Sequence, residues 1–454
     1  MSLHIIILAA GKGTRMYSKM PKVLHQIAGK SMLEHVIDTA EQLQPETINV
    51  VIGHGKEQVL TQLAHKKVNW VEQTEQLGTG HAVKVALPHI PNQGKTLILY
   101  GDVPLIDVDT LTQLVTQAGD EVGLLTDVLD NPTGYGRIIR NENNVVTAIV
   151  EEKDANESQK AIQEINTGIF VLPNAYLATW LDALNANNAQ GEYYLTDVIG
   201  LANADNVAVR PMAVRASYLA AGVNNKMQLA QLERTFQQKQ AQNLLQQGVG
   251  LLDPNRFDLR GTLTCAKDVV IDVNCVFSGS NELGENVKIG ANCVIHNAKI
   301  GANTVIAPFT HLENCEIGAN AQIGPFARLR PNAVLADDVH IGNFVEVKNT
   351  SIGKGSKANH LTYLGDATIG SQTNIGAGTI TCNYDGVHKY RTEIGDEVRI
   401  GSDTMLVAPV KIGNKATTGA GSVITKDCTE NTLVVARSRQ VVIDGWVRPE
   451  KPKK

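Results

Sequence analysis

The chain has 454 residues, more than a single hydrophobic core usually spans, so we expect at least two domains. Its 41 basic and 46 acidic residues give a formal net charge of −5, which argues against nucleic acid as a partner. No segment is long and apolar enough to cross a bilayer, and no signal-peptide pattern opens the chain, so we expect a cytoplasmic protein with no membrane partner.

The first predicted strand, residues 4–8, leads directly into a glycine-rich basic loop at residues 9–16. A run of Ile and Leu suits a buried parallel strand, and ligands bind at the carboxyl ends of such strands. The loop glycines allow backbone N–H groups to approach phosphate oxygens, while Lys12, Arg15 and Lys22 can offset the charge of a triphosphate. The loop therefore indicates a nucleotide site, although a turn that uses glycine for geometry alone stays an alternative.

Short apolar strands alternate with amphipathic segments up to about residue 225, which predicts a βαβ sheet with helices on both faces. The strand at residues 96–100 is followed by Asp102, a carboxylate that can hold Mg²⁺ or simply cap a turn. Gln73 and the glycine turn at Gly78 are suited to reading the edge of a base.

Polar or glycine-rich islands between the later strands could line a sugar pocket, but ordinary turns explain each island equally well. They contain Gly136, Glu151, Asn166 and Asn224.

Residues 226–247 are rich in Gln, Leu, Glu and Lys, contain no Gly or Pro, and are followed by Gly248. This composition predicts a helical linker, residues 226–248, between domains of residues 1–225 and 249–454. Beyond it, Ile-Gly pairs recur, and apolar residues such as Ile323 and Leu329 lie six residues apart. This period predicts a coil built from hexapeptide repeats. The longer interval from Ile375 to Ile394 predicts an exposed loop. The six cysteines show no metal-ligand spacing, so we expect reduced thiols in this core.

His360 lies where the repeat expects a small or apolar residue, within a His-Leu-Thr-Tyr-Leu-Gly-Asp segment. A histidine can act as a general base near neutral pH, and Glu346 could orient its ring, although a lone histidine is often structural. Arg330 and Lys348 could face a sugar phosphate or form an ordinary solvated basic face.

Taken together, these motifs resemble the bifunctional bacterial family of N-acetylglucosamine-1-phosphate uridyltransferases and glucosamine-1-phosphate N-acetyltransferases over essentially the whole chain. The glycine loop with Pro21-Lys22 looks like the nucleotidyltransferase signature, and the His360 segment with Asn383-Tyr384-Asp385 carries the second half of the resemblance. The family fold is an N-terminal Rossmann-like sheet followed by a left-handed parallel β-helix. The resemblance implies Mg²⁺, UTP, acetyl-CoA and glucosamine 1-phosphate as ligands, and a homotrimer. The implied product is UDP-N-acetylglucosamine for peptidoglycan and lipopolysaccharide synthesis.

The resemblance also implies roles for individual residues. For UTP or the uridine product the implied set is Leu8, Ala9, Ala10, Gly11, Arg15, Lys22, Gln73, Gly78 and Thr79. For the nucleotide sugar it is Tyr100, Gly101, Asp102, Gly136, Glu151, Asn166 and Asn224, with Asp102 and Asn224 also on Mg²⁺. For the amino-sugar phosphate it is Arg330, Lys348, Tyr363 and Asn374, with His360 as proton acceptor. For acetyl-CoA it is Ala377, Ser402, Ala420 and Arg437; Asn383 and Tyr384 would contact either substrate, and Lys389 and Arg391 are placed near the CoA phosphates.

Three alternatives stay open at this point. The coil could be a regulatory or oligomerising module beside a nucleotidyltransferase for another sugar. Both halves could form a degenerate binding protein. The acetyltransferase could also use another acceptor, because pocket shape rather than motif decides the sugar.

Overall fold

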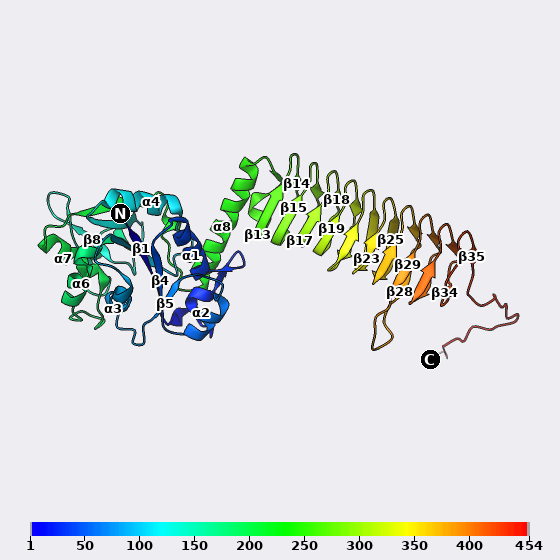
Figure 1. The fold of residues 1–454 in the computed structure, drawn as a ribbon, viewed down its shortest axis with the longest axis horizontal. Coiled ribbons are helices and arrows are strands. Elements are labelled where there is room, and N and C mark those ends of the chain that lie inside the picture. Colours follow the sequence, from blue (N-terminus) through cyan, green and yellow to red (C-terminus); the bar gives the residue numbers. More distant parts are fainter. Residues whose placement is uncertain (1, 452–454) are drawn as a thin grey trace. The chain divides into compact units, whose positions relative to one another are not determined.

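The computed structural model describes residues 2–451, and contacts divide the chain into two compact units, Met1–Phe236 and Gln237–Lys454. Unit 1 is an α/β domain and unit 2 is a parallel β-helix (Figure 1), so the predicted fold class is confirmed. Within the described residues, no helix combines the length and apolar character needed to span a membrane.

The main sheet of unit 1 has the strand order β11-β7-β10-β6-β1-β4-β5, with β8 and β9 attached at β10. Its strands are β1 (Leu3–Ala9), β4 (Thr47–Ile52), β5 (Asn69–Glu72), β6 (Lys95–Tyr100), β7 (Val122–Val128), β8 (Arg137–Arg140), β9 (Val146–Val150), β10 (Glu164–Pro173) and β11 (Val209–Ala213), and a separate pair is β2 (Gln26–Ile27) with β3 (Lys30–Ser31). The helices are α1 (Met32–Gln42), α2 (Lys56–Gln62), α3 (Thr79–Ala86), α4 (Val108–Ala118), α5 (Glu157–Lys160), α6 (Asn174–Ala183) and α7 (Val198–Ala204). Strand β1 lies between β6 and β4 and is parallel to both, whereas β10 is antiparallel to β6 and β7.

Strand β1 contributes to two separate cores because successive side chains of a strand point to opposite faces of the sheet. Ile5 and Ile7 pack in the core that includes α1, while Ile6 and Leu8 pack in the core that includes α3. Helices therefore cover both faces of the sheet, and β1 is buried on both sides, as its apolar run predicts.

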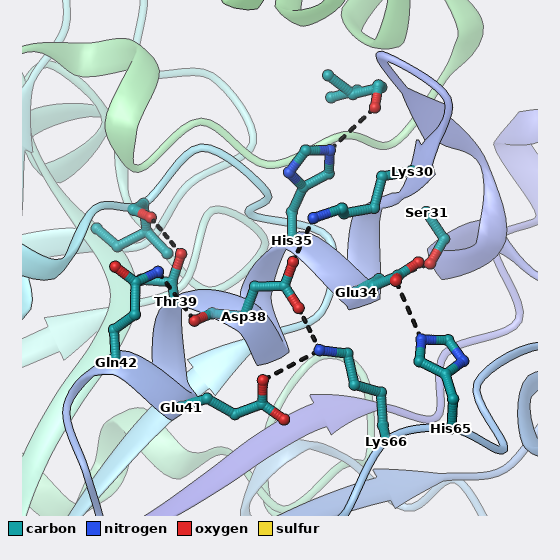
Figure 2. A network of polar contacts seen from close by, with 12 residues as sticks. Lys30, Ser31, Glu34, His35, Asp38, Thr39, Glu41, Gln42, His65 and Lys66 are labelled. Atoms are coloured by element: carbon teal, nitrogen blue, oxygen red, sulfur yellow. Dashed lines mark hydrogen bonds and ion pairs between the residues drawn. The ribbon is translucent and has the colours of Figure 1, made fainter. Parts of the chain in front are cut away.

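Helix α1 begins at a serine cap, since the Ser31 side chain accepts a hydrogen bond from the backbone of the first turn at 3.3 Å. Further along the helix, Asp38 lies between two lysines, Lys30 before the helix and Lys66 from the segment after α2 (Figure 2). Lys66 also reaches Glu41 at 3.0 Å. This network ties α1 to the segments that pack beside it.

Unit 2 contains the part of helix α8 (Lys226–Gln246) that follows Phe236 and a series of short parallel strands, most of them paired with a strand two or three places further along the chain, as β13 is with β15 and β26 with β29. The strands are β12 (Gly250–Leu251), β13 (Phe257–Cys265), β14 (Val270–Ile271), β15 (Cys275–Leu283), β16 (Lys288–Ile289), β17 (Val294–Ile300), β18 (Val305–Ile306), β19 (His311–Ile317), β20 (Gln322–Ile323), β21 (Arg328–Leu329), β22 (Ala333–Leu335), β23 (His340–Lys348), β24 (Ser351–Ile352), β25 (Lys357–Gly365), β26 (Ala367–Ile369), β27 (Asn374–Ile375), β28 (Ile380–Cys382), β29 (Thr392–Ile394), β30 (Arg399–Ile400), β31 (Met405–Val407), β32 (Val410–Ile412), β33 (Thr417–Thr418), β34 (Val423–Ile424) and β35 (Leu433–Val434). The side chain of buried Gln237 in α8 donates to the Leu259 carbonyl and accepts from the Leu259 N–H in β13. It thereby provides hydrogen-bond partners for backbone groups near the start of the β-helix.

The hexapeptide period has the predicted physical cause. The repeated apolar residues, such as Ile323, Leu329, Leu335 and Ile341, are buried in one continuous core. The interval predicted to form a loop does so, since residues 384–391 between β28 and β29 are exposed. All six thiols are free and at least partly buried, as expected.

Candidate functional sites

The carboxyl ends of β1 and β6 form one wall of a cavity of about 440 Å³ in unit 1. Leu8 is in register with Tyr100, and the Gly101 N–H donates to the Leu8 carbonyl at 2.9 Å, so the glycine loop and Asp102 lie side by side. The predicted residues that line this cavity are Leu8, Ala9, Ala10, Gly11, Lys22, Gln73, Gly78, Thr79, Tyr100 and Asp102.

The opposite wall is the turn at Gly78, which needs glycine. Its φ is +113°, and a Cβ would lie 2.6 Å from the backbone oxygen of Tyr193. Gln73, which is buried, donates its amide to the Gly78 carbonyl at 3.2 Å and contacts the His81 ring at 3.0 Å. The amide of Gln73 is therefore held in one orientation toward the cavity lined by this turn.

The side chains of Asp102 and Asn224 both contact the Lys22 ammonium, which lies close after the glycine loop in sequence. The Lys22 ammonium donates to the Asp102 carboxylate and, at 3.2 Å, to the Asn224 side-chain oxygen. Arg15 donates to the same Asn224 oxygen at 3.0 Å. The Lys22 and Asp102 side chains are only 14% and 16% exposed, so this ion pair is largely shielded from solvent.

The donor set at this point fits a hard divalent cation. Two oxygens of different chain segments, one from Asp102 and one from Asn224, converge on a single positive group, the Lys22 ammonium. No cluster of three or more His, Cys, Asp or Glu ligands occurs in the described residues. Mg²⁺ requires no such cluster, because it usually takes one or two protein oxygens together with substrate phosphates and water.

A second polar group lies near Tyr100, which lines the cavity: burial raises the pKa of Tyr100, and the charge of the Glu151 carboxylate adds to this effect. Asn166 donates its backbone N–H to the Gly136 carbonyl at 2.9 Å, and a Cβ on Gly136 would lie 3.3 Å from the Glu151 carboxylate. Burial raises the pKa of Glu151, whose carboxylate accepts a hydrogen bond from Thr196 at 3.2 Å. The structure thus brings Gly136, Glu151 and Asn166 together, outside the residues that line the cavity itself.

In unit 2, a group of basic residues gathers on adjacent turns of the coil. Arg330 pairs with Glu346 at 2.8 Å, and Glu346 is in register with Tyr363. Glu346 thus engages Arg330, where the sequence suggested that it orients His360. The Lys389 ammonium, brought in by the exposed loop, lies beside Lys348 and lowers the pKa of that lysine. Two adjacent ammonium groups with an arginine nearby concentrate positive charge, which attracts anions such as phosphate.

His360 begins a second row, in which one residue from each successive turn occupies the same corner. The backbone N–H of a residue on the following turn donates to the carbonyls of His360, Ala377 and Ser402 at 3.2, 2.6 and 2.8 Å. The Arg437 guanidinium donates to the Ala420 carbonyl at 2.6 Å. The four predicted acetyl-CoA residues therefore line up along the coil from the exposed side chain of His360.

The remaining predicted residues are placed differently. Asn374 is exposed and in register with Lys357 and Arg399. Asn383 is buried and bonded to Asp366, whereas Tyr384 is exposed on the loop and donates to the Gly386 carbonyl. Arg391 is held against the β-helix by hydrogen bonds to Ala367 and Thr368, and Lys389 lies beside Lys348.

Sequence reasoning missed Glu192, which lines the unit 1 cavity from the segment before α7. Nothing in its local sequence marks it. It reaches the cavity because Tyr193 pairs by backbone hydrogen bonds with Leu77 and Gly80, at 2.8 Å each. Lys12, which the sequence placed among the basic residues of the glycine loop, also lines the cavity.

Comparison with known proteins gives matches over both units. Residues 5–142 match a family model described as a MobA-like NTP transferase domain, and residues 259–352 and 311–417 match a GMPPB C-terminal domain. The chain is 69% identical to the bifunctional protein GlmU of Neisseria meningitidis serogroup B over 100% of this chain and 99% of that protein. It is 58% identical to the GlmU of Chromobacterium violaceum and 55% identical to that of Nitrosospira multiformis, in each case over 99% of both chains.

Proposed function

The chain belongs to the bifunctional GlmU family, and from this premise we propose how its residues divide the two reactions. It is an enzyme that acetylates glucosamine 1-phosphate with acetyl-CoA and transfers UMP from UTP to N-acetylglucosamine 1-phosphate. We assign uridylyl transfer to residues 1–225 and acetyl transfer to residues 249–454, with residues 226–248 as the linker.

In the first site, a phosphate oxygen of N-acetylglucosamine 1-phosphate attacks the α-phosphorus of UTP and pyrophosphate leaves. Since this nucleophile is already ionised, the protein needs no general base. Lys22 and Arg15 offset the charge on the phosphates, and Gln73 with the Gly78 turn holds the base. The observation that supports this assignment is the convergence of Lys22 and Asp102 at the end of the glycine loop.

We assign Mg²⁺ to Asp102 and Asn224, whose oxygens converge on one positive group. When bound, the metal supplies further positive charge to the triphosphate and orients it. The neighbouring group of Gly136, Glu151 and Asn166 is suited to the sugar, because backbone, carboxyl and amide groups can all bond to its hydroxyls.

In the second site, His360 accepts a proton from the amine of glucosamine 1-phosphate. The amine nitrogen forms a bond to the thioester carbonyl carbon of acetyl-CoA, the carbon–sulfur bond breaks, and the thiolate of CoA leaves with a proton. Arg330, Lys348 and Lys389 hold the sugar phosphate, and the row from Ala377 to Arg437 holds acetyl-CoA. The closeness of the two lysine ammonium groups supports this assignment, since Lys389 lowers the pKa of Lys348 and a bound anion would relieve the repulsion between them.

We further propose that three copies of the chain associate through an exposed aromatic ladder. Phe309, Phe326 and Phe344 stack at successive turns, with ring centroids 5.0 and 5.4 Å apart, and each is about half exposed. All three have positive φ, a conformation that bulky residues rarely adopt. An apolar ladder held in this way favours burial against another subunit. A cytoplasmic location stays a prediction.

The first experiment incubates the purified protein with glucosamine 1-phosphate, UTP and Mg²⁺, with and without acetyl-CoA. We expect pyrophosphate release that depends on acetyl-CoA and is accompanied by free CoA thiol. Release without acetyl-CoA would show that the first site accepts the unacetylated sugar. No release by the folded protein in either condition would contradict the assignment of substrates.

A further inference from the structure

A ladder of asparagines follows one corner of the coil. Asn297, Asn314, Asn332 and Asn349 recur at intervals of 17 or 18 residues, and all have φ between 46° and 64°. Asparagine tolerates this left-handed conformation. It can also relay hydrogen bonds along the coil, as where the Asn297 amide donates to the Asn314 side-chain oxygen at 3.0 Å.

Asp366 occupies the next position of this ladder, with φ 50°, and is its acidic exception. One carboxylate oxygen accepts from the Asn349 amide at 2.5 Å, and the other accepts from the Asn383 amide. An asparagine side chain has only one acceptor oxygen and could not accept from both neighbours in this way. Asp366 is only 9% exposed, and these two hydrogen bonds explain why a carboxylate occupies this position of the ladder.

The same residue contacts both ends of the exposed loop, through its side chain at Asn383 and through its backbone at Thr392. The Asp366 carbonyl accepts from the Thr392 N–H at 3.1 Å, while Asn383, held by the carboxylate, accepts the Tyr390 N–H at 2.8 Å. Asp366 also donates its own N–H to the Lys348 carbonyl at 3.0 Å. One side chain and its backbone thus connect Lys348 to the two ends of the loop.

This loop carries Lys389, which lies beside Lys348. Two ammonium groups repel each other, so they stay adjacent only if the backbone holds them there or a negative charge offsets the repulsion. The Asp366 carboxylate acts on Lys348 in this second way, because its charge works against the lowering of the lysine pKa by Lys389. The backbone of Asp366 bonds to Lys348 on one side and, on the other, to Thr392 at the end of the loop that carries Lys389.

We propose that Asp366 is a positioning residue, which anchors the 384–391 loop so that Lys389 and Lys348 together bind the phosphate of the amino-sugar substrate. This inference rests on the proposed acetyltransferase site. It concerns a residue that need not touch the substrate.

The test compares Asp366→Asn with Asn314→Asp, a matched exchange at the same corner of the coil, remote from the loop. We expect Asp366→Asn to raise the KM for glucosamine 1-phosphate about tenfold, because the phosphate loses a charged hydrogen bond. We expect kcat and the KM for acetyl-CoA to change less than about threefold, and Asn314→Asp to leave all three within that range. Calorimetry with glucosamine 1-phosphate alone should show the same loss of affinity.

Limited trypsin digestion reports on the loop directly. In Asp366→Asn, cleavage after Lys389 should become faster, while cleavage after Arg439 in the exposed C-terminal segment should keep its rate. The double variant Asp366→Asn with Asn383→Asp lets residue 366 accept from Asn349 and donate to residue 383. It should therefore recover both the KM and the resistance to trypsin relative to either single variant.

An unchanged KM and an unchanged cleavage rate in Asp366→Asn would overturn the positioning role. Faster cleavage at Lys389 and Arg439 alike, with no rescue by the double variant, would overturn it as well, because it would show a general loss of structure. Absence of acetyl transfer in the unaltered protein would refute the proposed site itself, and the inference with it.

Discussion

Replacement of Lys22 by methionine should have opposite effects on metal binding and on catalysis. The Lys22 ammonium occupies the point where the oxygens of Asp102 and Asn224 converge, which is the proposed metal position. A cation that binds there must displace it. Charge-assisted hydrogen bonds of this kind contribute about 1.5–3 kcal/mol, and both partners of the ion pair are largely buried, so little of this is lost to solvent screening.

Since about 1.4 kcal/mol corresponds to a tenfold change in affinity, Lys22→Met should bind Mn²⁺ roughly tenfold to a hundredfold more tightly in the absence of nucleotide. Electron paramagnetic resonance of free Mn²⁺ measures this constant. Uridylyl transfer should fall, because the same lysine offsets phosphate charge. Lys12→Met is the matched control: Lys12 lines the same cavity but is not a donor to either oxygen within the described residues, so we expect less than about a threefold effect.

Equal or weaker Mn²⁺ binding by Lys22→Met, with the circular dichroism spectrum unchanged, would refute the reasoning. An equal gain in Lys12→Met would show that general charge, rather than displacement of the ammonium, controls the affinity.

Three further predictions concern other parts of the chain. His360→Ala should lower acetyl transfer by about 10² to 10⁴-fold and leave pyrophosphate release from UTP and N-acetylglucosamine 1-phosphate intact; near-normal thiol release would exclude His360 as the base. Partial burial acts to raise the pKa of Asp38, but the hydrogen bonds from Lys30 and Lys66 outweigh it, so the pKa lies below its ordinary value. The stabilising effect of ionised Asp38 should therefore be complete above the unfolded-state pKa and disappear as the pH falls through the lower folded-state pKa. Asp38→Asn should lower the free energy of unfolding, measured by urea denaturation, by about 1 kcal/mol at pH 7 but not at pH 2. Phe326→Asp should dissociate the proposed trimer, and an unchanged mass in light scattering would contradict the role of the aromatic ladder.

Local sequence was sufficient for the features that depend on a short period or on a strand end. The six-residue spacing predicts the coil because each repeat has to bury one apolar side chain, and Ile323 and Leu329 do so. The extra residues before Ile394 predict the loop, because a regular turn cannot hold them. The position of Asp102 beside the glycine loop follows from the tendency of parallel strands to present their carboxyl ends at one edge.

Which distant residues meet was decided by the tertiary structure. Asn224 reaches Asp102 because Val223 donates its backbone N–H to the Asp102 carbonyl at 2.9 Å, a contact between segments more than a hundred residues apart. Lys389 reaches Lys348 because Asp366 holds both ends of its loop. A sequence shows the chemistry that a side chain can perform, whereas its partners depend on long-range packing and backbone pairing, which no short pattern encodes.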